Sequence, residues 1–183
     1  MDWSSFIPTL LATFTGVFLS FGAYRLWDWY KAKQQKATTK HILALEIIDN
    51  LGTLKAARTQ ANDVINGKGN IQTLCSSIST IHTLAYNAAF QRGDVHRMGD
   101  SILEGVLIKY AWSCESYNFG VRWLGEIVKE KFGFGDVPLE IAQTLVQPRL
   151  PLLDKLISRS LELLKMLDAD VGEVDTSSAQ SSG

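Results

Sequence analysis

The sequence is poor in residues that build covalent or metal-centred sites. It has 2 cysteines and 3 histidines among 183 residues. Cys75 and Cys114 lie far apart and form no C-x-x-C pair, which favours reduced core thiols over a disulfide or a thiolate metal site. No two histidines are four residues apart, the spacing that a helical metal site needs. The sequence therefore predicts no metal and no cofactor.

Catalytic motifs are absent too. Gly133-Phe134-Gly135 lacks the strand, lysine and helix start of a phosphate-binding loop. The serine and cysteine side chains have no evident base and orienting partner in the sequence. His82 lies beside an apolar stripe, which indicates a hydrogen-bonded core histidine. The sequence predicts no enzyme and identifies no small-molecule substrate.

Acidic residues do not form a repeated metal-binding pattern. Glu46, Asp49 and Asn50 lie together, but the chain has no Glu-x-x-His pair of the kind that binds two metals in a bundle. They are expected to make a solvated or interhelical polar contact, with Asn50 able to hydrogen-bond across helices. The net charge of −1 and the lack of a broad basic surface argue against nucleic-acid binding.

Charge is missing altogether from residues 3–24, a run of 22 residues. As a helix this run is about 33 Å long, enough to cross a hydrocarbon core of about 30 Å. Trp3 begins it, and Trp27, Trp29 and Tyr30 follow it, as is typical of rings in the headgroup layer. We expect a single-pass transmembrane helix within residues 1–25.

Three alternatives to a transmembrane helix fit this run less well. A buried helix of a soluble protein is usually shorter. A cleaved signal peptide would fit the small residues Ser20 and Gly22, but Asp2 gives its first segment the wrong charge. A helix lying on the membrane surface needs a polar face, which is absent between Phe6 and Tyr24.

Basic residues follow the run on one side only. Residues 25–40 hold five Lys or Arg against Asp28, and such a bias marks the cytoplasmic side. We therefore expect an inner-membrane protein with its N-terminus outside and its C-terminal domain in the cytoplasm. The absence of an N-x-[ST] sequon agrees with this topology. The expected lipid-headgroup contacts are Arg25, Lys31, Lys33 and Lys36.

In the remainder of the chain, apolar residues recur at the spacing of a helix, and no segment alternates apolar and polar residues as a strand does. One helix is expected from about Thr38 to Ile65, ended by the breakers at 66–70. A second should cover residues 71–88, followed by a loop at 92–99. No proline or glycine interrupts residues 23–51, so the first helix can continue the membrane helix, with the polar stretch Gln34–Thr39 as the place for a break.

The clearest helix lies between Asp100, a natural N-cap, and the stop at Phe132–Gly135. Its apolar stripe, with spacings of four and three, consists of Leu103, Leu107, Tyr110, Cys114, Tyr117, Val121, Leu124 and Val128. Pro138 should open a short helix to about Gln147. A last helix is expected from about Leu152 to Leu167, with its buried stripe at Leu153, Ile157, Leu164 and Leu167.

These elements predict an all-α fold, in which one N-terminal transmembrane helix is followed by an antiparallel bundle of four to five helices. The expected parts are a transmembrane helix at 1–25, a basic collar or stalk at 26–40, a bundle at 41–168 and a disordered acidic and polar tail at 169–183.

A membrane helix followed by a lysine-rich collar and the sequence Leu45-Glu46-Ile47-Ile48-Asp49-Asn50-Leu51 resembles a class of uncharacterised prokaryotic single-pass membrane proteins with a helical cytoplasmic domain. The resemblance covers about the first 55 residues. It implies an anchored helical module and no active site.

Two functions remain open at this point. The first is a membrane-anchored scaffold that docks a protein partner or a second copy of the chain; the expected interface is Trp112, Phe119 and Trp123, which fall off the core stripe. The second is a channel-like effector whose membrane helix oligomerises. The small residues Ala12, Gly16 and Ser20 recur every four positions and could form a helix–helix interface in the membrane in either case.

Overall fold

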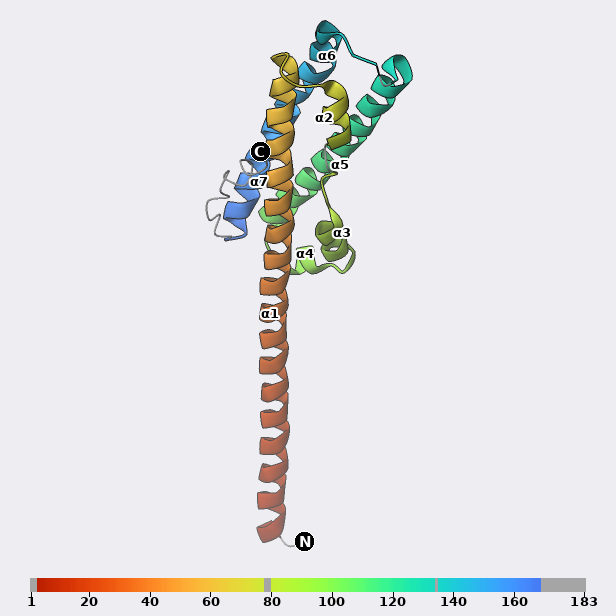
Figure 1. Ribbon diagram of the computed structural model, residues 1–183. Coiled ribbons are helices and arrows are strands. Elements are labelled where there is room, and N and C mark those ends of the chain that lie inside the picture. Colours follow the sequence, from red (N-terminus) through yellow and green to blue (C-terminus); the bar gives the residue numbers. More distant parts are fainter. Residues whose placement is uncertain (1–2, 78–79, 134, 169–183) are drawn as a thin grey trace, which may run out of the picture. The chain divides into compact units, whose positions relative to one another are not determined.

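The computed structural model describes residues 3–77, 80–133 and 135–168, without the side chains of residues 3–10, 12, 76 and 77. Within these ranges every regular element is a helix (Figure 1), which confirms the predicted all-α class. The chain divides into two compact units, Met1–Thr39 and Lys40–Gly183. The expected tail at 169–183 lies outside the described residues.

Helix α1 extends from Trp3 to Ile65, and the polar residues 34–39 are part of it. It ends where the sequence predicts. Gly67, just beyond the end, has φ of 72°, a left-handed conformation that glycine adopts without strain. Among the residues that the structure describes, no helix contains a stretch that is both long and apolar enough to cross a membrane.

Residues 71–88 do not form one helix, so that prediction is wrong. Helix α2 covers Ile71–Ser77, helix α3 covers Leu84–Gln91, and residues 80–83 have no regular structure. The loop predicted at 92–99 contains the four-residue helix α4, Asp94–Arg97.

Two asparagine side chains explain the break between α2 and α3. The Asn118 side chain accepts from the Ile81 N–H at 3.0 Å and donates to the Ile81 carbonyl at 2.9 Å. The Asn50 side chain does the same for His82, at 2.8 and 2.7 Å. We call this arrangement the asparagine clamp. It satisfies backbone groups that a helix would otherwise pair, so a segment without regular structure is stable there.

The clamp also overturns the prediction for His82. Its side chain is exposed rather than buried, and only its backbone is held by Asn50. Asn50 was expected to hydrogen-bond across helices; it does bond a distant part of the chain, but its partner is the His82 backbone, in a segment without regular structure rather than in another helix.

Helix α5, Ser101–Phe132, is close to its prediction. The Asp100 carboxylate accepts from the N–H groups of Ile102 and Leu103, as an N-cap does. All the residues of the predicted stripe are buried except Val121, which is half-buried. The stripe is therefore confirmed as core.

The C-terminal helices follow two prolines. Helix α6 covers Leu139–Val146, the 3₁₀ turn η1 covers Gln147–Arg149, and helix α7 covers Leu150–Met166. Pro148 and Pro151 each lie in the first turn of η1 or α7, where a missing N–H costs no helical hydrogen bond. The last helix therefore begins two residues before its predicted start.

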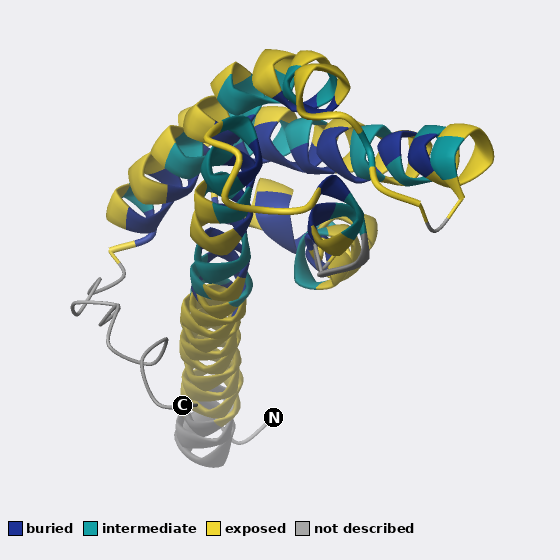
Figure 2. Cartoon of the chain, turned by 45° about the horizontal axis from the view of Figure 1, so that its top comes forward, coloured by how far each residue is buried: buried dark blue, intermediate teal, exposed yellow. Residues whose placement is uncertain are grey.

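The core of the second unit draws most of its buried residues from one face each of α1, α5 and α7, and the shorter helices add the rest (Figure 2). Helix α1 contributes Leu43, Ile47, Leu51 and Leu54, all almost fully buried. On α7 the stripe is wider than predicted, because Leu156 and Leu163 are buried as well as Leu153 and Leu164. Ile157 is only half-buried.

Candidate functional site

The outer face of α5 carries three aromatic side chains that the core does not cover. Trp112 is 74% exposed, Phe119 is 67% exposed and Trp123 is 50% exposed. They are seven and four residues apart, so they lie on one side of the helix. We call these three residues the aromatic strip. The sequence predicts that these three rings lie outside the buried stripe of the same helix, and their exposure agrees with that prediction.

Cations from a second segment border the strip on one edge. The Arg149 guanidinium lies 6.0 Å from the centroid of the Trp123 ring. Gly120 makes room for it, because a β-carbon on Gly120 would lie 2.8 Å from Arg149 Nη1. Nearer the start of α5, Arg159 Nη1 donates to the Ser113 hydroxyl and to the Lys109 carbonyl. These contacts place Arg149 and Arg159 along the same edge, which we call the basic edge.

The charge of Arg149 is not neutralised by an ion pair within the described part of the chain. The residue is half-buried. Burial lowers the pKa of its guanidinium, and the neighbouring Cys75 and Tyr117 side chains act in the opposite direction. An arginine beside a tryptophan, partly removed from water, is a favoured anchor for a protein partner.

The other edge of the strip begins with Glu115. This carboxylate is exposed and accepts from the Thr83 hydroxyl at 3.0 Å. Glu46, on α1, accepts from the N–H groups of Ala85 and Tyr86 at the start of α3, which confirms a polar contact between elements for this residue. The strip therefore has cations on one edge and a carboxylate on the other.

A hollow lies between α2 and α5. Two contiguous parts of about 350 and 470 Å³ share Cys75, Gly125 and Lys129. Burial raises the pKa of the Cys75 thiol, against the opposing effect of Arg149. A thiol with a raised pKa is mostly protonated and a weak nucleophile at neutral pH. The hollow is thus a surface depression without an activated group among the described residues.

Two titratable groups of the core, Cys114 and Tyr117, are held in their protonated forms. Burial raises the pKa of Cys114 to about 12, which keeps its thiol protonated. Burial raises the pKa of Tyr117 to about 12, and its hydroxyl has no hydrogen-bond partner within the described residues. In the same part of the chain, no group of three or more His, Cys, Asp or Glu side chains could hold a metal ion.

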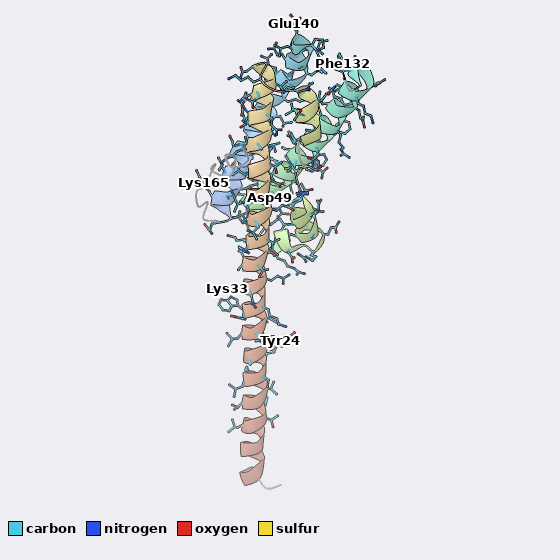
Figure 3. The ribbon with its side chains drawn as sticks, in the orientation of Figure 1. Tyr24, Lys33, Asp49, Phe132, Glu140 and Lys165 are labelled. Atoms are coloured by element: carbon cyan, nitrogen blue, oxygen red, sulfur yellow. The ribbon has the colours of Figure 1, made fainter. Side chains whose placement is uncertain are left out.

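The basic collar pairs its cations with its own aromatic rings. Each of three cations lies 5.3 or 5.4 Å from the ring four residues earlier: Arg25 from Phe21, Lys31 from Trp27 and Lys33 from Trp29. The side chains of Tyr24 and Lys33 project from α1 (Figure 3), and Lys36 is exposed on the same segment. In cation–π pairs of this kind the cation is attracted to the face of a ring one helical turn away.

The small-residue stripe of α1 is described only in part. The Ala12 side chain lies outside the described residues. Gly16 and Ser20 line a shallow hollow of about 550 Å³. A β-carbon on Gly16 would meet no atom within 4 Å, so this face of α1 is open.

Sequence reasoning identified the aromatic strip but missed its edges. Arg149 and Arg159 come from η1 and α7, between 26 and 50 residues away from their contacts on α5. Gly120 offered a local signal, because a glycine inside a helix leaves room for another group, but Gly105 on the same helix meets no atom within 4 Å, so the signal was not specific. Asn118 was missed as well, since the adjacent Tyr117 continued the apolar stripe.

Comparison of the chain with models of protein families, with curated proteins and with solved structures finds no match.

Proposed function

We propose that this chain is a non-enzymatic scaffold in which a single N-terminal membrane helix holds an antiparallel helical bundle at the cytoplasmic face of a membrane. The bundle docks a protein partner through the aromatic strip. The observation that carries the proposal is the strip itself: three large rings stay exposed on a helix whose opposite stripe is packed. Exposed aromatic clusters bordered by charge are typical of protein interfaces.

The uncovered surface of the first unit supports the membrane anchor. The apolar side chains that are described between Leu11 and Phe21 are between 58% and 72% exposed: Leu11, Phe14, Val17, Phe18, Leu19 and Phe21. A helix that is apolar all round requires either a protein core or a membrane to cover it. The rest of the uncharged run, residues 3–10 and 12, has side chains outside the described part of the chain.

Two hydroxyl groups of this segment, those of Thr15 and Ser20, favour an anchor over a channel. Thr15 donates to the Leu11 carbonyl and Ser20 to the Gly16 carbonyl, both at 2.8 Å. Hydroxyls bound to their own helix offer little polarity to a pore. We propose that Ala12, Gly16 and Ser20 instead pack against another membrane helix, where small residues allow close approach.

The proposed topology can be tested by labelling. A Ser182→Cys chain in a Cys75→Ser background should react with a membrane-impermeant maleimide only after the cells are permeabilised, because the basic collar keeps the following domain in the cytoplasm. The chain should also stay with the membrane in alkaline carbonate. Labelling of intact cells would contradict the orientation, and release by carbonate would contradict the membrane helix.

The proposed docking surface can be tested by truncating its rings. Trp112→Ala and Trp123→Ala should each reduce the binding free energy of a co-purifying protein by about 2 kcal/mol or more, as expected for central aromatic anchors. The thermal unfolding temperature should change little. Phe90→Ala is the matched control, because Phe90 is 50% exposed on α3, away from the strip. If both tryptophan variants unfold, or if the purified chain turns over a substrate, the scaffold proposal is wrong.

A further inference from the structure

We propose that the aromatic strip is covered by a second copy of this chain, with the two α5 helices side by side and parallel. This inference rests on the proposed docking function and names the partner of that surface. Two features of α5 and its neighbours carry it: the spacing along the strip and the charges on its two edges. The area of the rings then sets the strength of the association.

The spacing of the strip is that of a coiled-coil seam. Its line continues through neighbouring exposed residues with alternating steps of three and four: Lys109, Trp112, Ser116, Phe119 and Trp123. Such a pattern keeps one line of side chains facing a second helix over several turns. Helix α5 thus has two seams, one packed in its own core and one open.

The edges of the strip determine the direction of the second helix. In a parallel pair, Glu115 on one helix faces position 120 of the other, five residues further along. Position 120 is a glycine, and the Arg149 guanidinium occupies the space of the missing side chain. A parallel pair therefore places Glu115 against Arg149 of the second copy, twice by symmetry.

An antiparallel pair would bring like edges together. The basic edge of one copy, with Arg149 and Arg159, would then lie against the basic edge of the other. A lipid surface fits poorly for a related reason, because anionic headgroups would attract the basic edge and repel Glu115. The mixed edges thus favour the parallel pair.

The area of the strip predicts a weak association. From their exposed fractions, the three rings offer roughly 300–500 Å² per copy, taking 150–250 Å² for a fully buried aromatic side chain. A stable interface needs about 800 Å² per partner. The dimer should therefore depend on concentration, and the proposed confinement of both copies to one membrane would raise their effective concentration.

Disulfide trapping of the full chain tests the arrangement. Ser116 is exposed at the centre of the seam, where it would face Ser116 of the second copy. In a Cys75→Ser background, in detergent, Ser116→Cys should give a disulfide-linked dimer when copper(II) phenanthroline is added as the oxidant. Ser158→Cys is the matched control, because it places the same exposed thiol on α7 away from the strip. It should give little dimer.

Charge reversal then tests the contact between copies. Added to Ser116→Cys, Glu115→Arg or Arg149→Glu alone should reduce the dimer yield on the order of fivefold, as for a coupled charge pair at an interface. The two together should restore it, because the reversed charges attract again. Restoration also shows that the double variant is folded, so a folding defect of one single variant does not decide the result.

Several outcomes would overturn the inference. Equal dimer yields from Ser116→Cys and Ser158→Cys would do so, as would a double reversal that fails to restore the dimer. So would quenching by brominated lipid, in proteoliposomes, of a bimane label on the thiol introduced by Ser116→Cys, which would put lipid on the strip. If a different protein still co-purifies and is lost in Trp112→Ala, the docking proposal stands while the second copy is excluded.

Discussion

An Asn118→Ala chain should lose roughly 2–6 kcal/mol of unfolding free energy. Asn118 is 8% exposed and bonds both backbone groups of Ile81. Alanine would leave a buried N–H and a buried carbonyl without partners, and each such group costs about 1–3 kcal/mol. Denaturant unfolding of the full chain in detergent, followed by circular dichroism, measures the loss.

Asn87→Ala is the control for this prediction. Asn87 is exposed on α3 and donates only to the Thr83 hydroxyl, at 3.2 Å. Its removal leaves no buried group unpaired, so the effect should be within about 0.5 kcal/mol. Similar losses in the two variants would contradict the role of the asparagine clamp.

A Leu107→Ala chain should lose about 2–5 kcal/mol, because it creates a cavity at a site that is 1% exposed. Leu107 lies in the buried stripe of α5, and the same loss is expected for Leu124→Ala at an equally buried position. Thermal and denaturant unfolding of the full chain gives the value.

The exposed side of the same helix supplies the comparison. Ile102 is 72% exposed on α5, so Ile102→Ala should change the unfolding free energy by about 0.5 kcal/mol or less. If the Leu107 and Leu124 variants are as stable as the parent chain, the assignment of the α5 stripe to the core is wrong.

The sequence was most informative where structure depends on neighbouring residues. The start of α5 at Asp100, its end at Phe132 and its buried stripe follow from a cap, a glycine pair and a local period, and all three are found in the structure. The class of the fold could be predicted for the same reason. The periodicity of apolar residues and the residues that start or stop a helix act within a few turns of one helix.

The sequence was least informative where structure depends on distant residues. Residues 71–88 carry a helical period, yet the clamp stabilises a segment without regular structure at 80–83. The hydrogen bonds come from residues 32 and 37 positions away, which no local pattern reveals. The basic edge escaped prediction likewise, because Arg149 and Arg159 reach α5 only once η1 and α7 are packed.

The asparagine clamp has a consequence for the order of folding. Helical turns close through contacts between residues four positions apart, and they form within about a microsecond. The bonds to Ile81 and His82 need α1 and α5 to approach first, across separations of 32 and 37 residues. Bonds across such separations carry a loop-closure entropy that a helical turn does not, and contacts between distant residues slow folding. Residues 80–83 should therefore gain their protection from solvent late in folding and lose it as soon as α1 and α5 separate.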